Sequence, residues 1–560
     1  MMKFKTFLLL TIGSIVIVSC GEDWLETKPK GVASFDNFLN KKGVEDLLIG
    51  AYKVITGHNG STGEGWASAV SNWVWGSVCA DDAYKGSNPG DQSQINYLET
   101  FTVDAANSYV NDHWRLYFDG VARANNVLNA NKLATGMTDT EKILVEAQAK
   151  FLRAHYYFEL TIIHGKVPYI DENTENPGLV PNDRVLWKEI EADIQFGIDN
   201  LPLKWSDKGR PSKWAAKAFM SRVYLFQNKF SEARTLLRDI YENGGFTLVP
   251  DFQMNYLVST NNNAESIFEI QFTVNNGYTA NANPGDGICG PHFMGSSGFF
   301  QPTHSLVSAF RVDDAGLPLL DKKYSVEDIL PYSKTGAEVL YKGLVDPRLD
   351  KGIARPGVPI YDWGIHQGDS WIRNPNNGGP YINKKEFFYK SELGTVSSIT
   401  GRNFYSANNY RKYKLSHVIL WLAECEAEVG SLQEATKLVN LIRTRAKNSE
   451  VVKFADGTPA ANYLIQPYSV DFPSKEYARK AIRMEMRLEF SMEGLRFFDL
   501  VRWGIVEETM NNFMAVEANV IGYYEGMRFT KGQNEIWPIP QRQLDLSNLN
   551  TEVLKQNPGY

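Results

Sequence analysis

The stretch 481–504 constrains the fold of this chain more than any other, because it concentrates charged and aromatic residues at helical spacing. Two stripes of like charge follow an i, i+4 repeat, one of Arg479, Arg483 and Arg487 and the other of Glu485, Glu489 and Glu493. At about 100° per residue the stripes lie roughly 120° apart, with apolar residues between them. Such a helix is not a simple surface helix. Because buried charges must be paired, we expect partners on neighbouring helices.

Beyond Gly494 the spacing changes to an i, i+3 ladder of alternating charge formed by Glu493, Arg496, Asp499 and Arg502. Aromatic side chains are interleaved with this ladder. We interpret the whole stretch as a packed structural helix with internal ion pairs. The alternative, a catalytic carboxylate pair, is not favoured, because the glutamate stripe belongs to a helix that should be packed.

The N-terminus has the layout of a signal sequence. Two lysines precede an apolar run over 7–18, which is too short to span a bilayer as a stable helix. The run leads into Cys20 through small and apolar residues, and this resembles a bacterial lipobox. Residues 1–19 are therefore predicted to be a signal peptide and Cys20 to carry the lipid; an ordinary secretory signal is the alternative. The acidic residues 22–23 resemble the surface-export signal of Bacteroidetes lipoproteins.

Composition and cysteine usage argue against several classes of protein. The 560-residue chain has a net charge of −7, whereas nucleic-acid binding calls for a basic face. It has no CxxC or HExxH motif, so a zinc site is not expected. With Cys20 lipidated, three cysteines remain, which excludes a full disulfide framework, and Cys425 is expected to be a buried thiol. A calcium site at 283–287 is only weakly indicated, because that loop lacks the full spacing, and no metal or cofactor is predicted.

Apolar periodicity predicts helices over 43–55, 107–132, 138–164 and 185–201. The third begins with a sequence of capping-box form.

Two segments, 218–237 and 420–439, align without gaps as helix, short break and helix. Ala233 and Ala435 occupy matching places, where small residues let antiparallel helices pack closely. This is the pattern of a tetratricopeptide repeat, interrupted here by insertions. Two unrelated helical hairpins are the alternative.

The irregular sequence is concentrated in two insertions, 57–104 and 244–405, of which the second is rich in Gly, Asn and Pro. An alternating run over 266–272 predicts a β-strand. Loop-rich stretches of this length in a compact protein are usually functional.

The stretch 481–504 resembles the signature of the SusD/RagB-like nutrient-binding outer-membrane lipoproteins of Bacteroidetes. The residues that carry the signature are Arg483, Glu489, Glu493, Gly494, Arg496, Phe497, Asp499, Leu500, Arg502, Trp503 and Gly504. The segments 162–169, 410–413 and 536–560 and the pair 81–82 also look similar to the family. The resemblance covers essentially the whole mature chain and is weakest over 244–405.

This resemblance implies a mainly α fold, in which a tetratricopeptide-like scaffold of four helix pairs carries long irregular insertions and a few short β-strands. It implies one compact unit with an N-terminal SusD-like region over 20–240 and a C-terminal region over 241–560, whose helical part is 406–560. It also implies a non-enzymatic, lipid-anchored protein on the outer face of the outer membrane. Such a protein captures a glycan and delivers it to a SusC-like TonB-dependent transporter.

A glycan-binding surface needs flat aromatic faces and a few hydrogen-bonding groups. Because packing occupies the helices, we expect these groups in the insertions. The predicted ligand-binding residues are Trp73, Trp75, Asp81, Tyr84, Tyr278, Phe299, Trp363, Trp371 and Arg373. Polar, turn-rich neighbours favour exposure most at Tyr84, Tyr278, Trp363 and Trp371. Of the two neighbouring tryptophans, Trp73 and Trp75, one is expected to face the core.

Two other functions stay open. The same architecture binds peptides or another non-glycan nutrient if its pocket is a deep charged cleft rather than an aromatic platform. A glycoside hydrolase needs two carboxyl groups about 5–5.5 Å or about 6.5–9.5 Å apart across a cleft. No pair in the loops meets this description from sequence alone.

Overall fold

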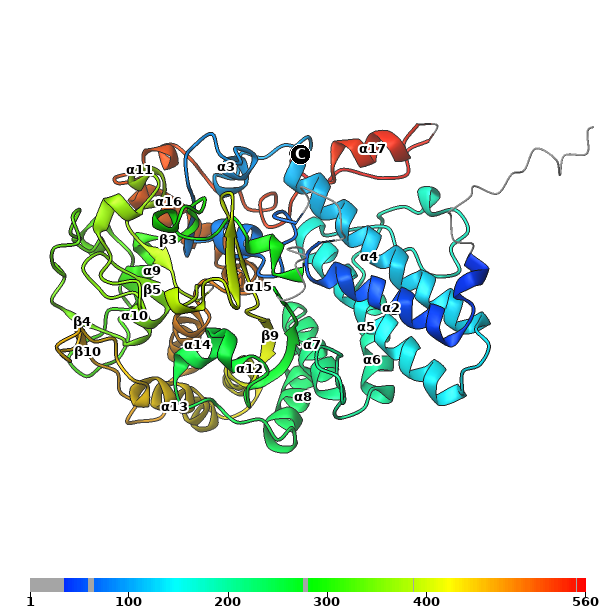
Figure 1. The fold of residues 1–560 in the computed structure, drawn as a ribbon, viewed down its shortest axis with the longest axis horizontal. Helices are drawn as coiled ribbons and strands as arrows, with labels where there is room; N and C mark the ends of the chain where they lie inside the picture. The colour runs from blue at the N-terminus through cyan, green and yellow to red at the C-terminus, as the bar shows by residue number, and fades with distance from the viewer. Residues whose placement is uncertain (1–34, 59–64, 275–280, 386, 550) are drawn as a thin grey trace, which may run out of the picture.

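Long helices packed side by side form the scaffold of the protein (Figure 1). The computed structural model describes residues 35–560 except 59–64, 275–280, 386 and 550. The scaffold helices are α2 (Lys41–Ile55), α4 (Ser108–Leu133), α5 (Asp139–His164), α6 (Trp187–Asn200), α7 (Lys213–Phe226), α8 (Phe230–Asn243), α12 (Leu415–Val429), α13 (Leu432–Asn448) and α14 (Lys475–Glu489). From α4 to α8 each helix packs on the next, and the predicted mainly α fold is confirmed.

Capping side chains set where several of these helices begin. At the start of α2, the backbone N–H of Gly43 donates to the side chain of Asn40 at 3.1 Å. Thr138 and Glu141 form the predicted capping box before α5. Both caps satisfy N–H groups that the first turn of a helix leaves without partners. The four helices predicted from periodicity are confirmed as α2, α4, α5 and α6, with their ends within two residues of the prediction.

The two similar sequence segments are helix pairs, α7–α8 and α12–α13. Ala233 and Ala435 are fully buried, as small residues between closely packed helices should be. A long insertion separates the pairs in sequence, yet α8 packs directly on α12. The buried carboxylate of Glu426 on α12 strengthens this contact, since it lies 2.7 Å from Arg234 on α8. The helices of the scaffold therefore form one continuous row in space, although the insertion between α8 and α12 lies outside that row.

The remaining chain forms further helices and two-stranded sheets, most of which lie on the side of α12–α14, while α17 lies beside α4 (Figure 1). The helices are α3 (Gln94–Glu99), α9 (His304–Ala309), α10 (Arg348–Gly352), α11 (Pro375–Gly378), α15 (Arg496–Arg502), α16 (Val506–Glu517) and α17 (Gln541–Ser547). The strand pairs are β1 (Ala83–Gly86) with β3 (Phe299–Pro302), β2 (Ser266–Ile270) with β9 (Tyr410–Lys414), β4 (Leu344–Val345) with β10 (Asn462–Tyr463), β5 (Ile353–Ala354) with β6 (Ile382–Asn383), and β7 (Ser397–Thr400) with β8 (Asn403–Ser406). The predicted strand over 266–272 is confirmed as β2. The β1–β3 pair joins the two predicted insertions.

The stretch 481–504 is not one continuous helix, which corrects the prediction. Helix α14 ends at Glu489 and α15 begins at Arg496. Between them Met492 has a φ of 61°, a left-handed conformation that an α-helix cannot continue through. Glu493 therefore lies in the turn and not on the glutamate stripe of α14.

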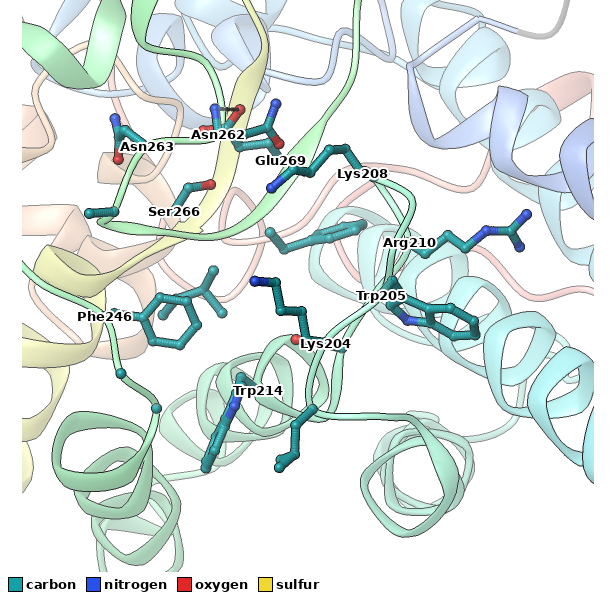
Figure 2. Close-up of a pocket in the computed structure, with 18 of the residues that line it drawn as sticks. Lys204, Trp205, Lys208, Arg210, Trp214, Phe246, Asn262, Asn263, Ser266 and Glu269 are labelled. Carbon is teal, nitrogen blue, oxygen red and sulfur yellow. Dashed lines mark hydrogen bonds between the residues drawn. The ribbon is translucent and has the colours of Figure 1, made fainter.

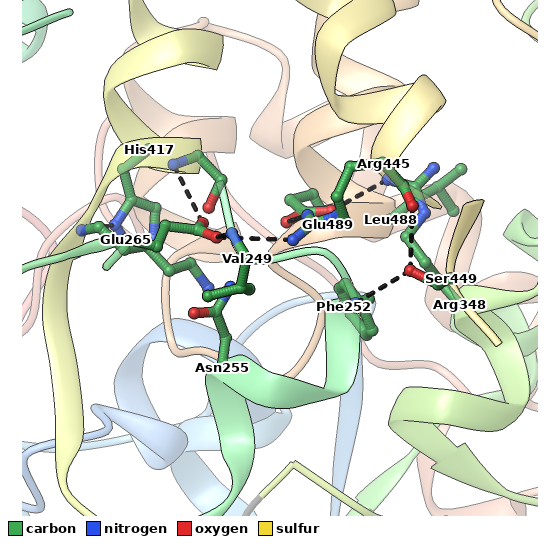
Figure 3. Close-up of polar contacts among 12 residues, drawn as sticks. Val249, Phe252, Asn255, Glu265, Arg348, His417, Arg445, Ser449, Leu488 and Glu489 are labelled. Atoms are coloured by element: carbon green, nitrogen blue, oxygen red, sulfur yellow. Dashed lines mark hydrogen bonds and ion pairs between the residues drawn. The ribbon is translucent and has the colours of Figure 1, made fainter. Parts of the chain in front are cut away.

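The carboxylates of α14 are buried and paired with arginines from other segments (Figure 3). Glu489 binds Arg445 of α13, and its second oxygen lies 3.1 Å from Nη1 of Arg348 in α10. The same Nη1 lies 2.7 Å from Glu485, which is 2.9 Å from Arg443 of α13. None of these five side chains is more than a few per cent exposed. The predicted pairing with neighbouring helices is confirmed.

Ion pairs made by the turn and by α15 extend the same network to both insertions. The carboxylate of Glu493 lies 2.8 Å from Lys385 of the second insertion and 2.7 Å from Lys414 at the end of β9. The guanidinium of Arg496 lies 2.8 Å from Asp81 of the first insertion. The predicted structural role of 481–504 is therefore confirmed: it ties the C-terminal helices to the loops.

Two predictions concern residues outside the described ranges, namely the signal peptide with Cys20 and the ligand contact at Tyr278. The other three cysteines, Cys79, Cys289 and Cys425, are buried thiols rather than disulfides, as expected. Among the helices of the described ranges, none is both long enough and apolar enough to cross a bilayer.

Gly494, in the turn between α14 and α15, lies too close to Ser71 to accept a side chain, and a substitution can test this. A Cβ on Gly494 (φ 66°) would lie 1.8 Å from the carbonyl oxygen of Ser71, whereas Gly504 (φ 69°) has open space around the same position. We expect Gly494→Ala to lower the free energy of unfolding by about 3 kcal/mol or more, and Gly504→Ala by about 1 kcal/mol. Urea unfolding followed by circular dichroism measures both. Equal losses would show that backbone strain alone, without the Ser71 contact, explains the effect.

The pairing of Glu489 should make stability depend on pH. Burial raises the pKa of this carboxyl, but Arg445 and Arg348 outweigh burial and lower the pKa to about 2. Because an unfolded glutamate has a pKa of about 4.3, the pairing stabilises the fold above that pH and is lost as the pH falls towards 2. Glu489→Gln should cost about 3–5 kcal/mol near neutral pH, since it leaves buried arginines underpaired. The difference in urea midpoint between wild type and variant should shrink between about pH 5 and about pH 3; a constant difference would contradict this origin.

Candidate functional site

The tryptophans of the first insertion lie in the core. Trp73 and Trp75 belong to the π-helical segment Trp73–Val78 and are 0% and 1% exposed. The indole N–H of Trp75 donates to the carbonyl oxygen of Ala67 at 2.6 Å, and its ring meets Trp537 edge-on. Only one of the pair was expected to face the core. Because both do, neither offers a face to a ligand, and the prediction is wrong at these two positions.

Three more predicted ligand residues are structural. Asp81 lies 2.8–2.9 Å from two arginines of 481–504, so ion pairs already use its carboxylate. Tyr84 on β1 is fully buried and donates its hydroxyl to Glu517 at 2.5 Å. Phe299 on β3 is almost fully buried against an indole ring. The predictions for Tyr84 and Phe299 are corrected for one physical reason, since every residue of β1 and β3 is buried, and the buried carboxylate of Asp81 is already paired.

Half-buried aromatic side chains of the second insertion do lie together. We call them the aromatic patch: Phe293, Tyr361, Trp363, Trp371 and Tyr389. The ring of Phe293 connects the two predicted tryptophans, since its centroid lies 5.5 Å from Trp363 and 3.9 Å from Trp371. Most of the patch rests on a small hydrophobic cluster that is separate from the main core. The structure thus brings Trp363 and Trp371 to one surface.

Within the patch, Trp371 has both ring faces covered. Phe293 stacks on one face at 3.9 Å and an interplanar angle of 19°, and His366 lies parallel at 5.5 Å. Burial lowers the pKa of His366 to about 3, so this ring is neutral at ordinary pH. Trp371 can therefore present an edge to a ligand but no open face.

Trp363 and Tyr389 are placed differently. One face of Trp363 packs on Phe387 at 5.7 Å, and its indole N–H donates to the carbonyl oxygen of Phe388 at 2.9 Å, which fixes its orientation. Tyr389 packs on Tyr361 at 4.6 Å. Within the described ranges no second ring lies parallel to either residue; Phe293 and Phe388 meet Trp363 edge-on, and the ammonium of Lys390 lies 6.0 Å from its centroid. These two residues hold the ring faces that a ligand can reach.

Two charged groups beside the patch, Arg373 and Asp362, already have partners, whereas Lys390 forms no ion pair within the described residues. Arg373, another predicted ligand residue, lies 3.0 Å from Asp91, which also accepts a hydrogen bond from Ser87 at 2.8 Å. This contact links the second insertion to the first. Asp362 accepts hydrogen bonds from the backbone N–H groups of residues 390–391, and these help to lower its pKa against the opposing effect of burial. The charged side chains of Arg373 and Asp362 hold the loops in place, which leaves the aromatic faces available for a ligand.

A pocket of about 440 Å³ lies between the α6–α7 loop and β2 (Figure 2). Trp205, Trp214 and Phe246 stand on different sides of it, and Lys204 and Lys208 extend into it. The sequence-based prediction missed the two tryptophans because they lie between predicted helices and not in an insertion. The available signal was a linker that combines two tryptophans with several lysines.

The weakly indicated calcium loop, 283–287, has one acidic residue, Asp286, which is buried. It accepts hydrogen bonds from Ser71 and, at 2.8 Å, from Asn283, and burial raises its pKa to about 6. In the part of the chain that the structure describes, no three or more His, Cys, Asp or Glu side chains gather as metal ligands would. The loop therefore offers a cation one carboxylate that is already engaged.

Comparison with known families gives matches across both regions of the chain. A model described as the SusD family matches residues 264–560, and one described as "Starch-binding associating with outer membrane" matches residues 23–225. A SusD-like protein of Bacteroides ovatus is 30% identical over 216 residues, which are 35% of this chain and 38% of that protein. SusD-like protein P2 of Formosa agariphila is 24% identical over 586 residues, which cover 100% of both chains.

A solved structure of a laminarin-binding SusD-like protein superposes with a TM-score of 0.67 at 23% identity, covering 93% of this chain and 100% of that one. A likeness at this identity shows a shared fold. The SusD family model spans just over half of the chain, including the stretch 481–504 on which the resemblance was first based. The chain belongs to the SusD family.

Proposed function

We propose that this protein binds glycans at the aromatic patch and does so without turning them over. The observation that carries the proposal is the pair of ring faces at Trp363 and Tyr389 on which no second ring stacks, beside Arg373 and Asp362, which are already engaged. The C–H face of a sugar ring packs well on such an aromatic plane, and surrounding polar groups then select the hydroxyl pattern.

The patch consists of half-buried aromatic rings, which favours a glycan over a peptide. A peptide site of the deep charged kind needs unpaired charges, but the salt bridge of Arg373 and the hydrogen bonds of Asp362 use the charges at this surface. The laminarin-binding relative supports a carbohydrate ligand by analogy of family and fold.

Binding without catalysis fits the acidic groups of the signature stretch. Glu485 and Glu489 are inaccessible and held by arginines, so they cannot approach a glycosidic bond. A general acid also needs a pKa raised towards the working pH, whereas the pKa of Glu489 is lowered.

We place the protein on the outer face of the outer membrane, anchored by a lipid on Cys20. The lipobox-like sequence before Cys20 supports the anchor, and the family description "associating with outer membrane" supports the compartment. A SusC-like TonB-dependent transporter is the proposed recipient of the glycan. Here the support is family membership alone.

A glycan array on the purified full chain should identify a ligand, and substitutions should then locate it. We expect Trp363→Ala and Tyr389→Ala each to weaken binding about five- to tenfold, since each removes one stacking face. Tyr241→Ala, which removes a half-buried tyrosine from α8, is the matched control and should leave affinity unchanged. Isothermal titration calorimetry gives the three dissociation constants.

Three results would count against the proposal. Binding of a peptide pool with no glycan bound would favour the other ligand class. Release of reducing sugar by the purified protein would show turnover. Equal losses in the patch variants and in the Tyr241→Ala control would move the ligand away from the patch.

A further inference from the structure

The pocket beside α7 has the walls of a binding site. Three half-buried aromatic residues belong to its lining: Trp214 at its base, Phe246 on one side, and Trp205 on the loop at the other side (Figure 2). The amide side chains of Asn262 and Asn263 line the opposite edge. A volume of about 440 Å³ suits one or two sugar units.

Most charged groups around this pocket are neutralised by the protein itself. Arg210 binds Glu45 and lies 3.5 Å from Asp207. Glu269 is buried, and one of its oxygens accepts from the backbone N–H of Asn262 at 2.8 Å. Its other oxygen lies 3.4 Å from the guanidinium of Arg411. Glu269 is therefore engaged, whereas the exposed carboxylate of Asp207 shares Arg210 with Glu45.

Two lysines are the exception. Lys204 and Lys208 are exposed and line the pocket, and neither pairs with an acidic group among the described residues. Figure 2 shows both side chains extending across the cavity towards the edge formed by β2. By contrast, Lys217, which lies over the ring of Trp214, pairs with Asp239. The cavity thus carries two ammonium groups without an ion-pair partner, beside the exposed carboxylate of Asp207.

We propose that this pocket binds an acidic sugar unit, with the carboxylate or sulfate group between the ammonium groups of Lys204 and Lys208 and the ring against Trp214. Ammonium groups make strong charge-assisted hydrogen bonds to either anion. The aromatic walls supply the apolar contact of a sugar ring, and the asparagine amides match its hydroxyls. A small inorganic anion would use the lysines but leave the aromatic walls without a partner.

This inference rests on the proposed function only in assuming a carbohydrate ligand. The residues that line the pocket include none of the aromatic patch, and Figure 1 draws α7 well apart from β5. The pocket is therefore a second site with a different preference. The patch offers mainly ring faces, and the pocket selects acidic sugars through its two lysines.

The test compares acidic glycans with their neutral counterparts on the purified full chain. The probes are a short oligogalacturonate with its carboxyl-reduced form and a sulfated oligosaccharide with its desulfated form. Lys204→Met and Lys208→Met should each weaken binding of the acidic probe about tenfold, because each removes a charge-assisted hydrogen bond. Lys188→Met, which removes an exposed lysine from α6, is the charge-matched control and should have no such effect. Binding of the acidic probe should also weaken as salt rises, because the lysines are exposed.

Each outcome is decisive. Preference for either acidic probe over its neutral form, lost in both lysine variants and in Trp214→Ala, supports the pocket and shows which anion it takes. Equal binding of acidic and neutral probes, unchanged binding in the double lysine variant, or no binding of either acidic probe overturns it. The Trp363→Ala variant separates the two sites: it should lose neutral glycans and keep the lysine-dependent preference. If the proposed function at the patch fails, the lysine effect can still be present, so the two failures are distinguishable.

Discussion

The buried pairing of charges around α14 and α15 is the interaction on which the rest of the structure depends. An unpaired charge in the interior costs several kcal/mol, so each carboxylate fixes the segment that supplies its partner. The partner of Glu493 is Lys385, and Phe387, two residues further along the chain, is the ring on which Trp363 packs. The side chains of the signature stretch are occupied by packing and ion pairs, and through Lys385 they hold in place the ring on which the proposed binding surface rests.

Features that are determined locally, by apolar periodicity and residue type, were predicted correctly from the sequence. Apolar spacing and the capping box at Thr138 located the scaffold helices, because a helix buries one face and must satisfy its first turn. Ala233 and Ala435 revealed the repeated helix pairs, since close helix packing needs small residues. The requirement that buried charges be paired predicted a network, although the partners, such as Arg348 from a distant loop, could not be identified.

The predictions that failed depended on burial, which arises from contacts distant in sequence. Tyr84 has polar, turn-rich neighbours, yet β3 and Glu517 enclose it. Trp371 is in the right region, but Phe293 and His366 cover its faces. Trp205 and Trp214 were passed over as linker and helix residues, and only the return of β2 past α7 makes a cavity between them. Residue type indicated which side chains can bind a sugar, and the fold decided which ones are reachable.

The aromatic patch and the pocket beside α7 differ in how many of their charged side chains have partners. This difference affects which ligands each surface selects. At the aromatic patch, Arg373 is balanced by Asp91 and Asp362 by backbone N–H groups, so most of the affinity comes from ring stacking, with the ammonium of Lys390 at the border of Trp363. A protein with only this surface would have a single exposed lysine with which to favour an acidic glycan over a neutral one of the same shape. Specificity is a difference of affinities and needs a group that the wrong ligand leaves unsatisfied. On this chain Lys204 and Lys208 meet that condition, because a neutral sugar beside them leaves both ammonium groups without an anion.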